Sequence, residues 1–309
     1  MERTLIKQGG GGYTIYLPKP WVDKKGLKEG DKIRLQEKDT SLVIQASVLG
    51  RRVTTLALDP EAKSEIKVLL THLYRRGFDA INIENTDEKS FKEIKAILPL
   101  LLGFEITERT SRKCTLENLS EPTDQKYDVL LRRLFIIIQE TLEKMIQDAE
   151  NNAFKHLEEV RELRDQHDKF VLFCRRILTK EQEERNSALA WELLTFLTHI
   201  EHAIYYTYLH AASKKVKCGK ETKNLVKELQ NYFSLYYEAY LRKDDNAIHK
   251  INSGKEKYHF GKCLELLKSA KGEEVIFLSY IREVYRLIQI GTSPLFSELL
   301  IEKEVKDLN

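Results

Sequence analysis

The sequence predicts a multidomain α+β protein, because its residue patterns change twice along 309 residues. The first fifty residues alternate apolar and polar side chains as half-buried strands do, whereas the stretch after Glu121-Pro122 has helical spacing. Strand and helix patterns take turns between these two regions. A chain of this length exceeds the size at which one hydrophobic core usually keeps growing. We therefore expect four domains, at residues 1–47, 52–119, 123–213 and 219–305.

The first segment is predicted to be β-structure. Turn residues, among them the run Gly9–Gly12 and the pair Gly30-Asp31, separate four strand-like runs, Arg3–Lys7, Tyr13–Leu17, Lys32–Glu37 and Ser41–Ala46. So short a unit buries too little of its surface to form a good core alone. Dimerisation by strand exchange would repair that deficit, so a homodimer is expected.

The second segment has the pattern of a small α/β module. Helices are expected after Asp59-Pro60 and after Asp87. The Asp side chain can accept hydrogen bonds from the free N–H groups of a first helical turn, and Pro fits that turn because it has no N–H group that would need a partner. Strands are expected at Val53–Leu58, at Ala80–Glu84 and as a pair near Glu105–Glu117. Glycine-rich loops of the kind that cradle phosphates are missing between these strands and helices.

The rest of the chain is predicted to be helical. Apolar residues recur at intervals of three and four, which is the stripe of a core-facing helix. Six long helices are expected, at 124–149, 152–178, 182–213, 220–242, 245–270 and 273–303. Six helices of this length favour two three-helix bundles in tandem.

Basic residues are in excess only at the start of the chain. Residues 1–50 contain nine Lys or Arg and six Asp or Glu, an excess that equals the whole net charge of +3. The remaining residues are balanced. An anionic partner is therefore sought first at this end.

Other classes of protein are disfavoured. No apolar run approaches the roughly 20 residues that span a bilayer, and the opening residues Met1–Thr4 lack the apolar region of a secretory signal, so a cytoplasmic protein without membrane insertion is expected. Its four cysteines form no CxxC pair, and reduced thiols are expected. Because no nucleophile signature, P-loop or paired-acid motif is found, neither an enzyme nor a cofactor is predicted.

The first 47 residues carry several family features in order. Tyr13–Pro18 precede a short helix that holds Trp21, Gly26-Leu27 follow, and Gly30-Asp31 open another strand. The segment resembles the AbrB/MazE/SpoVT swapped-hairpin family, in which two chains interleave hairpins to form a dimeric β-barrel. The resemblance implies that basic residues on one side of the dimer contact DNA, here Arg3, Lys7, Lys19, Lys24 and Lys25.

Clustered Lys and Arg would bind phosphates with an affinity that falls with salt, whereas base-edge contacts would supply sequence preference. The alternative is that these are solvated charges on a domain used only for dimerisation.

The helical half resembles the PhoU family, which regulates phosphate uptake and has two three-helix repeats with E/D-x-x-x-D metal motifs. In this sequence Glu201 is followed by Tyr205 where a second acid is expected, and Tyr285 and Gln289 take both acidic positions of the other motif. A metal cluster is therefore not predicted. Glu201, His199 and His202 are weak candidates for a residual metal site, and polar contacts between helices or surface histidines are the alternative.

The order of the segments resembles archaeal PhoU-domain regulators with an amino-terminal AbrB-like domain. This favours a homodimeric DNA-binding transcription regulator linked to phosphate uptake or homeostasis. Alternatively, the chain is a signalling adaptor that docks on a phosphate transporter or kinase and uses its first domain only to dimerise. An antitoxin role is a third possibility, because the first segment also resembles antitoxin dimerisation domains.

Overall fold

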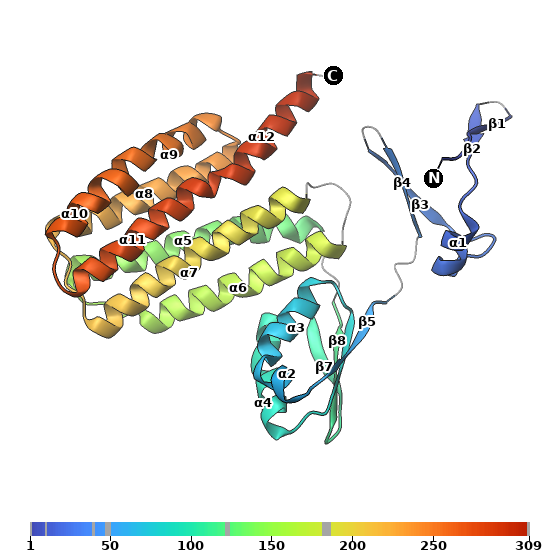
Figure 1. Ribbon diagram of the computed structural model, residues 1–309, viewed down its shortest axis with the longest axis horizontal. Helices are drawn as coiled ribbons and strands as arrows, with labels where there is room; N and C mark the ends of the chain where they lie inside the picture. Colours follow the sequence, from blue (N-terminus) through green and yellow to red (C-terminus); the bar gives the residue numbers. More distant parts are fainter. Residues whose placement is uncertain are drawn as a thin grey trace. The chain divides into compact units, whose positions relative to one another are not determined.

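The structure is a computed structural model that describes residues 2–9, 11–38, 41–46, 51–120, 124–180 and 187–307 (Figure 1). The chain divides into two compact units, Met1–Arg52 and Val53–Asn309. Short strands dominate the first unit, and the second contains a mixed sheet followed by long helices. The predicted multidomain α+β class is thus confirmed. The division of the second unit into three domains stays a prediction.

The first unit consists of two antiparallel hairpins and one short helix. The elements are β1 (Ile6–Gln8), β2 (Gly12–Thr14), α1 (Lys19–Lys25), β3 (Ile33–Lys38) and β4 (Ser41–Ala46). Within the described residues, β1 pairs with β2 and β3 pairs with β4, and no pairing joins the two hairpins.

The first two strands are shorter than predicted. Expected over Arg3–Lys7 and Tyr13–Leu17, they form a ladder that runs only from the pair Ile6 and Thr14 to the pair Gln8 and Gly12. Alternation of side chains predicts strand conformation, but a strand also needs a partner for its backbone groups. Arg3 consequently lies just before β1, outside the ladder.

Glycines set the turns of this unit. Gly9 and Gly11 have φ of 57° and 133° in the β1–β2 connection, which confirms the predicted turn at these positions. Gly26 ends α1 at φ 65° and donates its N–H to the carbonyls of Asp23 and Val22. Residues with a Cβ rarely adopt such angles, so glycine suits these positions.

The second unit begins with the expected α/β module, residues 53–118. Its sheet has the order β5-β6-β8-β7, in which β5 and β6 are parallel and the other neighbours antiparallel. The helices lie on one face of the sheet (Figure 1). The elements are β5 (Val53–Ala57), α2 (Pro60–Ser64), α3 (Ile66–Arg75), β6 (Ala80–Glu84), α4 (Glu88–Ile97), the 3₁₀ turn η1 (Leu98–Leu100), β7 (Phe104–Arg109) and β8 (Lys113–Asn118).

Cross-strand pairs form the core of this module. Ile81 stands opposite Leu116, and Ile83 stands opposite Cys114, with all four side chains buried. The predicted helix start at Asp87 is confirmed, since its carboxylate accepts from the N–H of Ser90 in a capping box.

Long helices make up the remainder. They are α5 (Asp124–Asn151), α6 (Leu157–Lys180), α7 (Ser187–Lys214), α8 (Lys220–Arg242), α9 (Asp245–Lys257), the π-helical turn η2 (Tyr258–Lys262), α10 (Cys263–Ser269), α11 (Glu273–Ile290) and α12 (Thr292–Asp307). Helices α5, α6 and α7 pack on one another, as do α8, α9 and α11. The two sets share one core, because α5 also packs on α8 and α7 on α11.

Two predicted helices are interrupted. The helix expected at 245–270 contains the π turn η2, where a Cβ on Gly261 would lie 2.8 Å from the carbonyl oxygen of Glu256. The helix expected at 273–303 ends at Ile290 and restarts at Thr292, and the Tyr236 hydroxyl donates to the carbonyl of Gly291 between them at 2.8 Å. Both breaks involve tertiary or backbone contacts, which cannot be predicted from the spacing of apolar residues in the sequence.

Arg176 ties α6 to the α/β module. Its guanidinium is fully buried and donates to the carbonyls of Tyr74 (3.0 Å) and Phe78 (2.7 Å) and to Asp79 Oδ1 (3.0 Å). Lys180 Nζ lies 2.6 Å from the same carboxylate oxygen. A buried charge persists only when its donors are used, and here most of the acceptors belong to the end of α3 and the loop that follows it.

Replacement of Arg176 by Met should therefore destabilise the protein by about 3 kcal/mol, because two buried carbonyls and one carboxylate lose a donor. Urea unfolding followed by circular dichroism measures the change. The control is Arg161→Met, which removes a partly exposed arginine on the same helix that interacts with Glu158 and Tyr205 and should cost less than about 1 kcal/mol. Equal losses in the two variants would contradict an anchoring role.

Candidate nucleic-acid interface

The five basic residues predicted to contact DNA are all exposed in the first unit. Arg3 precedes β1, Lys7 lies in β1, and Lys19 is the first residue of α1. Lys24 and Lys25 form the last turn of the same helix. The structure brings Lys24 and Lys25 together at one helix end, while the other three stand at separate positions.

None of these five side chains forms an ion pair with another residue in the part of the chain that the structure describes. Basic residues of the second unit are often neutralised instead, as in the pairs Lys63–Asp87 and Lys113–Glu84. Unpaired, exposed cations are available to phosphate groups, and binding then releases counterions.

The end of α1 holds its lysines in a defined place. Beyond Gly26, the N–H of Leu27 donates to the carbonyl of Val22 at 3.1 Å. The N–H of Lys28 donates to Asp31 at 2.7 Å. Positive charge at a helix carboxyl end is favourable in itself. The two lysines are therefore placed by the helix and by the turn that closes it.

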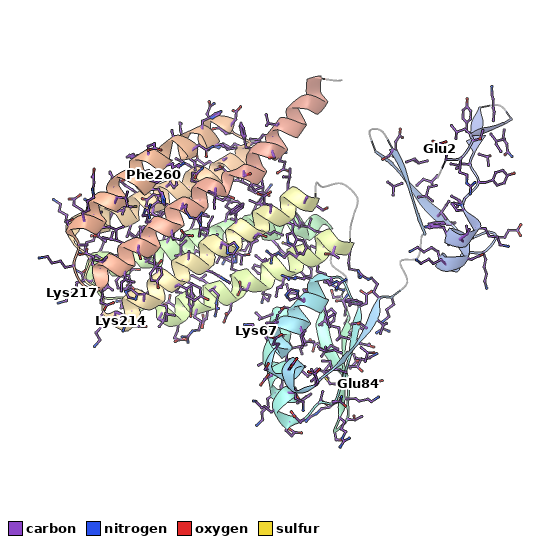
Figure 2. The ribbon with its side chains drawn as sticks, viewed as in Figure 1. Glu2, Lys67, Glu84, Lys214, Lys217 and Phe260 are labelled. Carbon is purple, nitrogen blue, oxygen red and sulfur yellow. The ribbon has the colours of Figure 1, made fainter. Side chains whose placement is uncertain are left out.

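Apolar side chains of the first unit are left uncovered. No described residue of this unit is buried, and Leu5, Tyr13, Tyr16 and Leu35 are 64%, 66%, 70% and 57% exposed. In the second unit, by contrast, side chains fill the spaces between the helices (Figure 2). Exposure of this many large apolar groups on so small a unit is typical of a surface that another chain covers.

In the hairpin β3–β4, the exposed apolar side chains lie on one face. Ile33, Leu35 and Glu37 are alternate residues of β3 and therefore lie on one face. Ile44 and Leu42 of β4 stand opposite Leu35 and Glu37, so they lie on the same face. Leu35 and Leu42 are each 57% exposed. One face of the hairpin is thus mainly apolar and uncovered within the single chain.

Comparison with known proteins finds a similarity for this unit. Residues 6–50 match the family model of MazE, an antidote-toxin recognition protein and bacterial antitoxin. The match supports the predicted AbrB/MazE-like domain at the start of the chain. Neither a curated protein nor a solved structure matches. The PhoU-like interpretation of the helices stays a prediction.

The weak metal candidates on α7 do not converge. Glu201 is fully buried, His199 is exposed, and Nε2 of His202 donates to Asp168 Oδ1 at 2.8 Å. Among the described residues, no group of three or more His, Cys, Asp or Glu side chains is arranged to hold a metal ion. Where an acid was expected, Tyr205 and Tyr285 are buried instead, and the Tyr285 hydroxyl donates to the carbonyl of Leu225.

Glu201 and His167 are unusual buried groups. Burial raises the pKa of Glu201 to about 8, partly offset by the hydrogen bond from Thr141. Burial lowers the pKa of His167 to about 3, and neither ring nitrogen has a hydrogen-bond partner among the described residues. Both side chains are therefore neutral near pH 7 and behave as part of the core.

A polar network that sequence patterns did not indicate joins α5, α6 and α7. The buried carboxylate of Asp148 accepts from the Tyr208 hydroxyl and lies 2.9 Å from His156 Nδ1. Burial by itself would raise the pKa of Asp148, but these hydrogen bonds outweigh it and lower the pKa. All partners are within the network, so it fixes the α5–α6 connection rather than offering a binding site.

None of the described helices is long and apolar enough to span a membrane.

The raised pKa of Glu201 predicts a specific pH dependence. The carboxyl has an ordinary pKa of 4.5 and a folded-state pKa of about 8, so the folded state holds this proton more tightly. Its contribution to stability is therefore intact below pH 4.5 and is lost as the pH rises towards 8. Glu201→Gln keeps the side chain neutral and should be more stable than the wild type at pH 8 by roughly 2 to 4 kcal/mol.

The difference between the two proteins should vanish at pH 4, and urea unfolding at both pH values measures it. Exposed Glu143 on α5 provides the control, since Glu143→Gln should have little effect at either pH. A Glu201→Gln protein with the same pH profile as the wild type would show that the buried carboxyl is not protonated.

Proposed function

We propose that the chain is a homodimeric DNA-binding transcription regulator, and that the first unit provides both the dimer contact and the DNA contact. The observation that carries the proposal is the set of exposed basic side chains without ion pairs among the described residues, four of them (Lys7, Lys19, Lys24 and Lys25) on the segment that matches the MazE model. An exposed cation without a carboxylate partner favours a polyanionic ligand.

Dimerisation follows from the uncovered apolar surface of the same unit. Burying apolar area stabilises by about 25 cal/mol per Å², and a second copy offers a matching surface of the same kind. A swapped-hairpin arrangement would also supply partner strands for the short ladder of β1 and β2.

The second unit is proposed to sense an effector or to dock a partner. A ligand bound by one arrangement of the helices would change DNA affinity through linkage. The link to phosphate uptake is supported only by the resemblance of the helices to PhoU. A cytoplasmic location belongs to the same proposal.

The MazE match favours an antitoxin as a second candidate. Both candidates dimerise and bind DNA through the first unit, so they differ in the task of the second. Loss of an antitoxin arrests growth of its host, whereas loss of a regulator changes transcription, and a gene deletion distinguishes the two. A signalling adaptor, in contrast, would bind no DNA even at low salt.

Genome-wide DNA co-purification with the intact protein, compared with a chain lacking residues 1–47, tests the proposal. Enriched sites should be recovered with the intact chain and lost with the truncated one. Enrichment with neither chain would favour the adaptor, and enrichment with both would place DNA binding in the second unit.

Lys24→Ala/Lys25→Ala should weaken DNA binding at every salt concentration, and the slope of log affinity against log salt should fall by about 2. Fluorescence anisotropy with labelled duplex DNA measures both quantities. The matched control is Lys268→Ala/Lys271→Ala, which removes two exposed lysines from the second unit. Identical salt slopes in all three proteins would rule out Lys24 and Lys25 as phosphate contacts.

Leu35→Glu should weaken the dimer by about 100-fold or more, because a charged side chain would enter the apolar face of β3–β4. Sedimentation velocity over a concentration series measures the dissociation constant. Leu119→Glu is the control, since Leu119 of the second unit is also exposed, at 65%. An unchanged dimer in Leu35→Glu would show that this face lies outside the interface.

A further inference from the structure

Two arginines from different parts of the second unit have their backbone carbonyls on either side of one hydroxyl group, where α3 packs on α6. The Thr179 hydroxyl on α6 lies 2.8 Å from the carbonyl oxygen of Arg75 and 3.0 Å from that of Arg175. Arg75 is the last residue of α3, and Arg175 precedes the anchoring residue Arg176. The α/β module and the helices thus each contribute one arginine to this junction, and the charge of Arg75 acts on the guanidinium of Arg175.

Neither arginine has a carboxylate partner among the residues that the structure describes. The guanidinium of Arg75 contacts only the ring nitrogens of His72, at 2.7 and 3.0 Å. That of Arg175 donates to Thr195 at 3.1 Å and lies 5.2 Å from the centre of the Trp191 ring. Nε of Arg175 is buried without a hydrogen-bond partner.

Nearby acids are already engaged. Asp79 accepts from both Arg176 and Lys180, and Asp168 pairs with His202. Burial and the charge on Arg75 lower the pKa of Arg175 to about 10. Burial and the charges of Arg75 and Arg76 also lower the pKa of His72. The charge of Asp168 offsets the lowering at Arg175 only in part, so two like charges act on one another at a partly desolvated place.

A purely structural role accounts for Arg176 but not for this pair. Arg176 satisfies the carbonyls of Tyr74 and Phe78, whereas the side chains of Arg75 and Arg175 donate to no carbonyl of the residues that the structure describes. The Trp191 ring offers only a weak cation–π contact to one of the two charges. Unused guanidinium donors in a partly dry setting match the several acceptor oxygens of an oxyanion.

We propose that Arg75 and Arg175 bind an oxyanion group of a small molecule, such as a phosphate, sulfate or carboxylate group, at the junction of α3 and α6. This goes beyond the proposed function, because it gives the second unit a ligand site whether or not the first unit binds DNA. An anion held by both arginines favours the docked arrangement of the α/β module on α6, and so makes that contact responsive to ligand.

Trp191 provides a direct readout. The chain contains two tryptophans, so Trp21→Phe leaves Trp191 as its only tryptophan. Inorganic phosphate, sulfate and citrate are titrated separately at constant ionic strength into this full-length variant, and calorimetry repeats each titration. A saturable change in Trp191 fluorescence with matching heat is expected for at least one anion, and the ranking of the three distinguishes the oxyanion classes.

Arg75→Gln and Arg175→Gln should each weaken binding at least tenfold, and the double variant should abolish it. Arg175→Lys keeps the charge without the planar fork and should bind with intermediate affinity. Arg161→Gln, which removes an exposed arginine elsewhere on α6, should bind normally. Circular dichroism confirms that each variant is folded. Absence of saturable binding for all three anions, or binding that survives in the double variant, would overturn the proposal.

Discussion

The apolar side chains of the first unit have too little chain around them to be buried, and this constraint explains most of its features. Its strands stop where their in-chain partners end, and Leu35 and Leu42 stay exposed on one face of β3–β4. A second copy of the same segment would meet that need with a surface of identical chemistry. Dimerisation would also double the number of basic side chains offered to one duplex, which is how a small unit achieves useful affinity.

The second unit buries its apolar side chains within one chain. Its sheet and helices share a core, and one buried guanidinium, that of Arg176, joins α6 to the loop after α3. A buried charge without a partner is costly. The stability of this junction therefore depends on the geometry of its hydrogen bonds, whereas an apolar contact has no such requirement. The neighbouring Arg75 and Arg175 add positive charge that Asp168 offsets only in part, and the oxyanion proposed for this junction would bind there.

Sequence patterns predicted the fold well wherever the signal is local. The helix expected at 220–242 has these bounds in the structure, and the capped start at Asp87 was also foreseen. The π turn at Tyr258–Lys262 and the break at Gly291 were missed because hydrophobic spacing reports neither the backbone contact of Gly261 with Glu256 nor the hydrogen bond of Tyr236 with Gly291. The five basic residues could be named from family resemblance, but their lack of ion pairs needed coordinates. Arg176 was missed because buried arginines are rare, although its position among the apolar residues Phe173, Ile177 and Leu178 is a usable signal.

Hydrogen–deuterium exchange at two protein concentrations tests the central claim most directly, because a unit that needs a second copy should be protected only when that copy is bound. Backbone amides of β1 to β4 should exchange more slowly at the higher concentration, while the amides of α5 to α11 exchange at the same rate in both samples. Protection of β1 to β4 that is strong and independent of concentration, in a protein that sediments as a monomer, would contradict the claim.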